Sequence, residues 1–199
     1  MKNTILSAKD LCKSFAHNGG QLHILSHIDL KLFEGDFTVI MGASGSGKST
    51  LLYALSGMDR ATAGQVIYNN ADLVTMSEKM NLSSVKSHLP SQVSGGQQQR
   101  CAIARVVINQ PKLLFADEPT GALNRKISID VLNLLTELNF SGQSILMVTH
   151  DIKAALRATR LLYLEDGKII GNLTLPPYKP DEEKSRETQI NAWLGSMEW

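Results

Sequence analysis

Apolar and polar residues alternate through the first part of the chain. The alternation is partial over residues 5–11 and clearer over residues 24–32, where polar side chains separate Ile28, Leu30 and Leu32. A period of two residues is typical of strands that bury one face. These two segments therefore predict an antiparallel pair of strands at the start of the chain.

Short runs rich in apolar residues recur after this pair and predict further strands. They lie at residues 37–41, 64–68, 112–116, 144–149, 161–164 and 168–173. Apolar residues at helical spacing are found between the runs, at residues 48–57, 126–140, 151–158 and after residue 96. Strands that alternate with helices predict an α/β fold, with a mostly parallel sheet flanked by helices beside an N-terminal antiparallel β subdomain.

The end of the chain changes in character at Pro176. Prolines and a charged run interrupt the pattern, and helical spacing then returns. The residues with this spacing are Ile190, Trp193, Leu194 and Met197. We therefore expect a domain at 1–175 and a tail at 176–199 with a short amphipathic helix. Periodicity favours docking of that helix on its own domain over binding to a partner.

Composition excludes several classes of protein. A length of 199 residues suits one domain, and a net charge of +1 gives no reason to expect bulk attraction to nucleic acid. Cys12 and Cys101 are too few, and too far apart in the chain, to predict a disulfide framework or a metal site. No apolar run is typical of a signal peptide or a membrane span. Action at a membrane would therefore need another subunit.

The segment 42–50 satisfies the pattern G-x-x-x-x-G-K-[ST] between a predicted strand and a predicted helix. Its residues are Gly42, Ala43, Ser44, Gly45, Ser46, Gly47, Lys48, Ser49 and Thr50. Glycines let backbone N–H groups and the helix N-terminus approach a polyanion. Lys48 is expected to reach the β- and γ-phosphates and the Ser49 hydroxyl to ligate Mg²⁺. The segment therefore predicts binding of a nucleoside triphosphate with Mg²⁺.

Two carboxylates end the apolar run 112–116. Asp117 and Glu118 follow it directly, and the carboxyl end of a parallel strand is where ligands bind in α/β sheets. Asp117 is expected to hold Mg²⁺, directly or through water. Glu118 is expected to orient and deprotonate the attacking water. An acidic surface turn is the alternative, but it leaves the apolar run before the acids unexplained.

A second candidate anion site precedes the helical segment after residue 96. It consists of Ser94, Gly95, Gly96 and Gln97. Two glycines and a serine hydroxyl at a helix N-terminus favour an anion. Taken alone, the same residues also fit a serine-capped helix that binds no anion.

These motifs together resemble the nucleotide-binding subunit of an ABC transporter. The phosphate loop, Ser94–Gln97, the strand ending at Asp117 and Glu118, and His150 occur in the order found in that family. The resemblance covers residues 1–173 and implies the P-loop NTPase fold. Further matches around 58–64, 90–92 and 116–123 are similar to the subgroup of macrolide exporters, lipoprotein-releasing ATPases and antimicrobial-peptide transporters.

The resemblance implies roles for individual residues. Phe15 matches the aromatic that stacks on adenine, and His150 matches the switch histidine that contacts the γ-phosphate. Ser94–Gln97 match the signature that contacts the nucleotide held by a second subunit, which implies a head-to-tail dimer of two copies. The family also implies a membrane permease as partner and a location on the cytoplasmic face of the membrane. It implies no nucleic-acid partner.

The chain departs from the family pattern in two places. The segment 51–93 is shorter than the family's, and it has no match for the glutamine loop and the helical subdomain; we place an omission near residues 76–81. Asn124 stands where the family has an aspartate. Two hypotheses follow. The chain is an ATPase that powers a permease, or it is a nucleotide-binding regulatory module without useful turnover.

Overall fold

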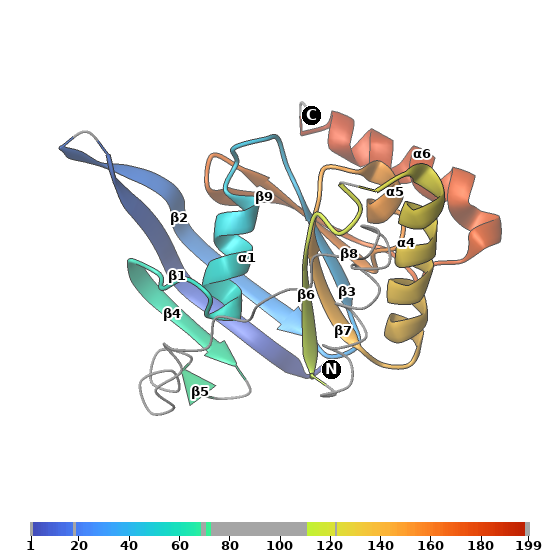
Figure 1. Cartoon of the computed structure of the whole chain (residues 1–199), viewed down its shortest axis with the longest axis horizontal. Helices are drawn as coiled ribbons and strands as arrows, with labels where there is room; N and C mark the ends of the chain where they lie inside the picture. Colours follow the sequence, from blue (N-terminus) through green and yellow to red (C-terminus); the bar gives the residue numbers. More distant parts are fainter. Residues whose placement is uncertain (1, 18, 69–70, 73–110, 122, 198–199) are drawn as a thin grey trace, which may run out of the picture.

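A computed structural model describes residues 2–17, 19–68, 71–72, 111–121 and 123–197. Its strands form two sheets, which lie side by side in Figure 1. The first sheet has the strand order β2-β1-β4-β5, and the second has the order β6-β7-β3-β8-β9. The predicted absence of the helical subdomain and the predicted helix after residue 96 both concern residues outside the described ones.

The first sheet is antiparallel and confirms the predicted β subdomain. Its strands are β1 (Thr4–His17), β2 (Gly20–Phe33), β4 (Ala63–Tyr68) and β5 (Ala71–Asp72). β1 and β2 extend well beyond the predicted segments, as a long ribbon on the left of Figure 1. The prediction missed this extension because the end of the ribbon is exposed on both faces and therefore shows no apolar alternation.

The second sheet is the predicted, mostly parallel one. Its strands are β3 (Phe37–Met41), β6 (Leu113–Asp117), β7 (Ser144–Val148), β8 (Arg160–Glu165) and β9 (Lys168–Thr174). All neighbours pair in parallel except β8 and β9, which form an antiparallel hairpin at one edge. Their side chains alternate between two apolar cores. Phe37 and Val39 lie in one core and Ile40 in the other.

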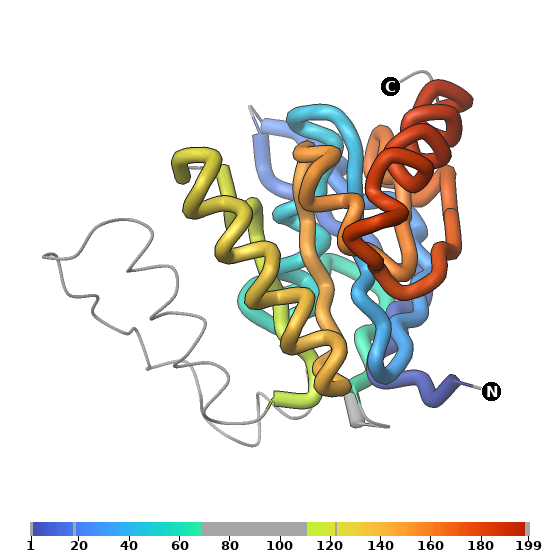
Figure 2. The backbone as a smooth tube through the Cα atoms, turned by 90° about the vertical axis from the view of Figure 1, so that its right-hand side faces the viewer, coloured from blue at the N-terminus to red at the C-terminus, as the bar shows by residue number. Residues whose placement is uncertain are grey.

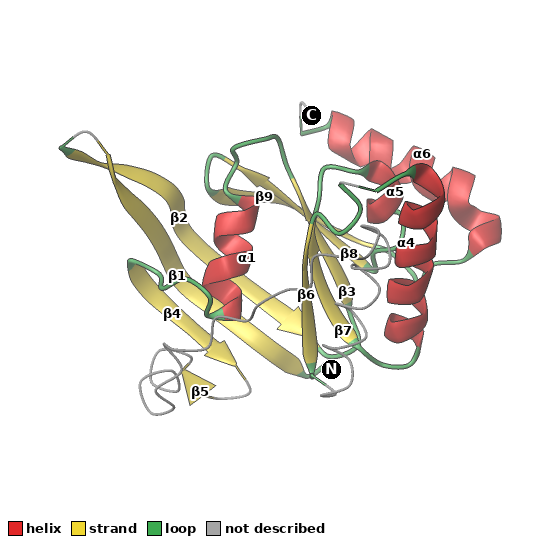
Figure 3. Ribbon diagram, viewed as in Figure 1, coloured by secondary structure: helices red, strands yellow, loops and turns green. Residues whose placement is uncertain are grey.

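Helices cover both faces of this sheet. They are α1 (Lys48–Ser56), α4 (Arg125–Phe140), α5 (Ile152–Ala155) and α6 (Glu183–Gly195), which a short 3₁₀ turn at Pro180–Glu182 precedes. Figures 2 and 3 show α4 and α6 on the same side of the sheet, and α1 lies on the other side, beside the first sheet. Among these helices, none is long and apolar enough to cross a membrane.

α5 ends earlier than predicted, and α4 begins directly after a capping residue. The helix capped by Asp151 was predicted to reach residue 158, but α5 ends at Ala155. Hydrogen bonds to the third preceding residue, as in a 3₁₀ turn, replace the helical ones there, since Arg157 N donates to Ala154 O and Ala158 N donates to Ala155 O. At the start of α4, Asn124 Oδ1 accepts a hydrogen bond from Ile127 N over 3.1 Å, so Asn124 caps the helix.

The tail helix α6 packs on the body of its own chain. Ile190 and Leu194 are buried in the same core as α4 and the central strands. The Arg186 guanidinium donates hydrogen bonds to the carbonyls of Leu156, Ala158 and Pro176. Apolar burial and a satisfied buried cation both fix α6 against the sheet.

Candidate nucleotide-binding site

The loop between β3 and α1 lines a cavity of about 680 Å³. Gly42 has a φ of 154°, and a Cβ there would lie 2.1 Å from Leu164 O. Gly47 has a φ of 100° and forms the N-cap of α1. A side chain at either position would strain or block the loop, so glycine is required for its close approach to neighbouring backbone. The cavity is lined by Ile24, Gly42, Ala43, Ser44, Gly45, Gly47, Lys48, Ser49, Thr50, Glu118 and His150.

Lys48 and Ser46 show how the loop suits an anion. Lys48 Nζ donates hydrogen bonds to Gly42 O and Ala43 O, each over 2.8 Å. Burial lowers the pKa of Lys48, although the charges of Glu118 and Asp117 act in the opposite direction. Among the described residues, Ser46 Oγ is the buried side-chain polar atom that has no hydrogen-bond partner. A phosphate oxygen beside the loop would satisfy that hydroxyl and the lysine.

Three hydroxyl and carboxylate side chains meet next to Lys48. Ser49 Oγ donates to Asp117 Oδ1 over 3.0 Å, and Tyr53 Oη donates to Asp117 Oδ2 over 2.9 Å. The structure thus brings together the two residues predicted to hold Mg²⁺. A hydroxyl and a carboxylate are the oxygen ligands that Mg²⁺ prefers, so the donor set fits this ion.

Tyr53 was missed by the sequence analysis. Its hydrogen bond to Asp117, the charge of that carboxylate and burial together raise the pKa of the Tyr53 phenol. A signal was available, because Ser49 and Tyr53 are four residues apart on α1 and therefore lie on one helix face. A ligand at Ser49 predicts a neighbour at Tyr53.

Glu118 has a left-handed backbone conformation with a φ of 42°. Its N–H donates to Val148 O of β7 over 3.0 Å, which joins the ends of two adjacent strands. Its carboxylate accepts a hydrogen bond from Thr149 Oγ1 over 3.0 Å and lies 2.8 Å from His150 Nδ1. The predicted base and the predicted switch histidine are therefore neighbours. Thr149, which the sequence analysis did not select, holds the other carboxylate oxygen.

Phe15 is not brought to the cavity wall. It lies on β1, opposite Leu22, and is 43% exposed. Lys13 Nζ lies 4.8 Å from the centre of its ring. Stacking of Phe15 on a base stays a prediction. Ser94–Gln97 lie outside the described residues, so their predicted contact with a second copy stays a prediction as well.

Comparison with known proteins decides the family. The ABC transporter model matches residues 25–85 and 73–121. The lipoprotein-releasing system ATP-binding protein LolD of Syntrophotalea carbinolica is 30% identical over 84% of this chain and 97% of its own length. The chain belongs to the ABC transporter ATP-binding family. This confirms the resemblance and the fold class predicted from the sequence.

Two longer relatives match the chain over part of their length. The macrolide export ATP-binding/permease protein MacB of Pasteurella multocida is 29% identical over the whole of this chain, which covers 38% of that protein. MacB of Marinobacter nauticus is 33% identical over 97% of the chain and 39% of its own length. The chain thus spans well under half of each MacB protein and nearly all of LolD.

Solved structures agree with the fold of this cassette. A dimeric ATP-binding cassette in a post-hydrolysis state, bound to ADP and Pi, superposes with a TM-score of 0.74 at 28% identity. That comparison covers 87% of this chain and all of the solved one. A nucleotide-free cassette, at 20% identity and a TM-score of 0.73, shows the same fold.

The sequence comparisons also bear on the shortened segment. The alignment with LolD has 221 positions, more than the chain contributes with 84% of its 199 residues, so LolD carries residues that this cassette lacks. The family match is broken into two parts that overlap at 73–85. The predicted omission near residues 76–81 lies in that overlap.

Proposed function

We propose that this cassette binds ATP with Mg²⁺ and hydrolyses it to power a separate membrane permease. The observation that supports this most strongly is the shared cavity. It places the Lys48 ammonium of the phosphate loop, the Glu118 carboxylate and the His150 imidazole around one space. Asp117 and Ser49 are hydrogen-bonded to each other at its edge.

Binding of the triphosphate uses groups of the loop. Lys48 exchanges the carbonyls of Gly42 and Ala43 for phosphate oxygens, and Ser46 Oγ gains an acceptor. The backbone N–H groups at the start of α1 add their partial positive charge. Ser49 and Asp117 would hold Mg²⁺, which supplies charge that stabilises the transferred phosphoryl group when bound.

Hydrolysis needs a base for the attacking water, and Glu118 takes that role. Its carboxylate is aimed by Thr149 and lies beside His150, whose side chain is 71% exposed and free to contact a γ-phosphate. Lys48 and the loop N–H groups stabilise the charge that develops on the phosphate.

The working unit is a head-to-tail dimer. Residues 1–175 form the nucleotide-binding domain in this proposal, and residues 176–199 form a tail docked on it. Ser94–Gln97 of one copy complete the site of the other copy. The dimeric cassette with ADP and Pi, and the names of LolD and MacB, support a dimer that works on the cytoplasmic side of the membrane with a permease.

The Glu118→Gln variant of the full chain tests this proposal. We expect ATP hydrolysis to fall by about 100-fold or more, because the substitution removes the carboxylate base and keeps the size and shape of the side chain. ATP binding should stay within about twofold, and ATP should now trap a dimer visible by size-exclusion chromatography with light scattering. Glu137→Gln, at an exposed position on α4, is the matched control and should hydrolyse ATP normally.

Two results would change the proposal. Undiminished hydrolysis in Glu118→Gln would remove Glu118 from the base role. ATP binding without hydrolysis in the unmutated chain would instead support the regulatory module, which the shortened segment motivates. Two observations favour the ATPase: the similarity to LolD, and the presence of Lys48, Glu118 and His150 around one cavity.

A further inference from the structure

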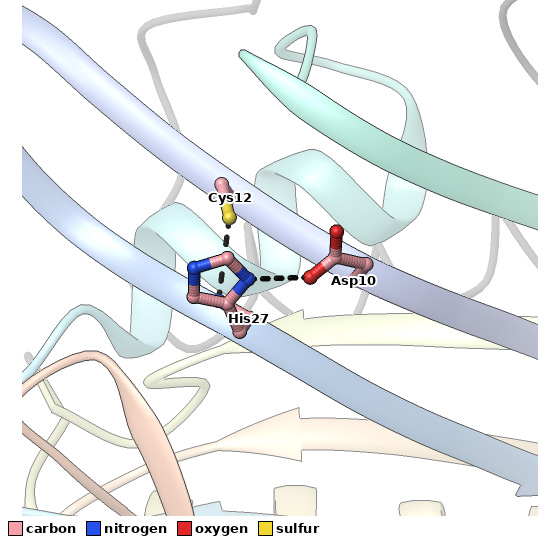
Figure 4. A group of neighbouring side chains, drawn as sticks. All are labelled: Asp10, Cys12 and His27. Atoms are coloured by element: carbon pink, nitrogen blue, oxygen red, sulfur yellow. Dashed lines mark hydrogen bonds and ion pairs between the residues drawn. The ribbon is translucent and has the colours of Figure 1, made fainter.

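Three potential metal ligands meet on the first sheet, outside the nucleotide site. Asp10 and Cys12 belong to β1 and His27 to β2. Strand pairing is irregular there, with register shifts on either side of Leu11, and both Asp10 and His27 have left-handed backbone conformations. Figure 4 shows the three side chains directed toward one another. Their ligand atoms all lie within 4.8 Å of one another.

The contacts within this cluster leave it open to solvent. His27 Nδ1 lies 2.5 Å from Asp10 Oδ1, and His27 N donates to Cys12 Sγ over 3.3 Å. The His27 and Asp10 side chains are 74% and 69% exposed, whereas Cys12 is half-buried. The half-buried sulfur is therefore fixed by the sheet, and the two exposed side chains can adjust to a ligand.

The donor set selects a class of ion. Mg²⁺ and Ca²⁺ prefer oxygen ligands only, whereas one sulfur, one imidazole nitrogen and one carboxylate oxygen are typical ligands of Zn²⁺. Three protein ligands leave one tetrahedral position for water. The sequence predicted no metal site at its cysteines, because Cys12 and Cys101 are few and far apart in the chain. That prediction considered cysteines alone, whereas two of the three ligands here are Asp10 and His27.

We infer that Asp10, Cys12 and His27 bind one Zn²⁺ ion. The ion takes the place between Asp10 Oδ1 and His27 Nδ1, and the Cys12 thiol loses its proton to solvent on binding. Two ligands of a tetrahedral Zn²⁺ lie about 3.3 Å apart when each bond is about 2.0 Å, so the Asp10–His27 contact must lengthen. Rotation of these exposed side chains is enough for that change.

The position of the site gives it a structural consequence. The ion joins β1 to β2, three residues before Phe15 on β1 and three residues after Ile24 on β2. Ile24 lines the nucleotide cavity. Zn²⁺ therefore stabilises the ribbon next to that cavity, and its binding needs no nucleotide.

Zn²⁺ titration of the full chain, without nucleotide and in competition with a chromophoric chelator, tests this inference. We expect one Zn²⁺ per chain and a rise in melting temperature with Zn²⁺. Cys12→Ala, His27→Asn and Asp10→Asn should each weaken binding at least about tenfold. Asparagine tolerates the left-handed conformation of positions 10 and 27, so the last two variants are expected to fold.

Two control variants separate this site from other ligands. Cys101→Ser removes the other thiol, and His23→Ala removes a histidine that lies earlier on β2; both variants should bind Zn²⁺ as the unmutated chain does. Co²⁺ adds an independent readout, since thiolate ligation gives it a charge-transfer absorption band, which Cys12→Ala should abolish. Absence of Zn²⁺ binding, unchanged affinity in the three ligand variants, or loss of binding in Cys101→Ser would each overturn the inference.

Discussion

Tyr53 Oη donates a hydrogen bond to Asp117 Oδ2 over 2.9 Å, which connects α1 to the end of β6. Ser49, one helical turn earlier on α1, holds the other carboxylate oxygen of Asp117. The helix that begins at the phosphate loop thus also fixes the carboxylate proposed to bind Mg²⁺. Orientation of an acidic ligand by a second hydrogen bond is a common feature of metal sites.

Tyr53→Phe is expected to raise the Mg²⁺ concentration needed for half-maximal ATP hydrolysis by about tenfold, the equivalent of about 1.4 kcal/mol. The phenyl ring keeps the packing, but Asp117 loses the hydrogen bond that fixes its second oxygen. Binding of ATP without Mg²⁺ should not change. Tyr68→Phe, the same chemical change on β4, serves as the control. An Mg²⁺ dependence equal in both variants would show that Tyr53 does not position Asp117.

Thr149 leads to a second prediction. Its buried hydroxyl donates to Glu118 Oε2 and accepts from Asp151 N, each over 3.0 Å. Thr149→Val keeps the shape of the side chain and removes both bonds. We expect kcat to fall about tenfold with little change in KM for ATP, and the free energy of unfolding to fall by about 1–2 kcal/mol.

Thr149→Ser is the matched variant, since it retains the hydroxyl and should retain most of kcat. Steady-state ATPase kinetics and urea unfolding give the two readouts. If the serine and valine variants lose kcat equally, packing rather than the hydrogen bond to Glu118 explains the loss.

The strands and helices were predictable where burial is regular. β7 is buried on both faces and gives a continuous apolar run, whereas α4 buries one face and gives apolar residues at helical spacing. The long ribbon was not predictable, because its end buries neither face. The left-handed residues Asp10 and His27 also interrupt the alternation where β1 and β2 pair irregularly.

The site residues that follow directly from a motif or from the end of a predicted strand were predictable. Lys48 follows a glycine loop and Asp117 ends a parallel strand, so both were expected at the same edge of the sheet. Thr149 was not expected, because its role depends on β6 and β7 being neighbours, and the sequence does not specify strand order. The Asp10–Cys12–His27 cluster depends in the same way on the register of two strands.

The lowered pKa of Lys48 predicts how nucleotide binding depends on pH. Burial holds this pKa below its ordinary value of 10.5, so the free cassette loses the Lys48 proton at a lower pH than the unfolded chain does. Phosphates favour the ammonium form, so ATP binding takes up a proton in that range. Affinity for ATP should therefore be full at neutral pH and fall as the pH rises through the lowered pKa.

Lys48→Arg provides the comparison, because a guanidinium stays charged throughout this range. Its affinity at neutral pH is expected to be lower, since the longer side chain fits the loop less well, but it should not fall further with rising pH. Titrations with a fluorescent ATP analogue between about pH 7 and about pH 10 give both curves. Parallel curves for the two proteins would assign the pH dependence to another group.

The tail helix gives the last prediction, which concerns stability. Leu194 of α6 is 1% exposed and belongs to the core that α4 and the central strands share. Leu194→Ala leaves a cavity there and should lower the free energy of unfolding by about 2–5 kcal/mol in urea titrations. Asn191→Ala, on the exposed face of the same helix, should stay within about 0.5 kcal/mol of the unmutated chain. If both variants are equally stable, α6 does not dock on its own domain in solution. Its apolar face would then be available to a partner, the alternative that periodicity left open.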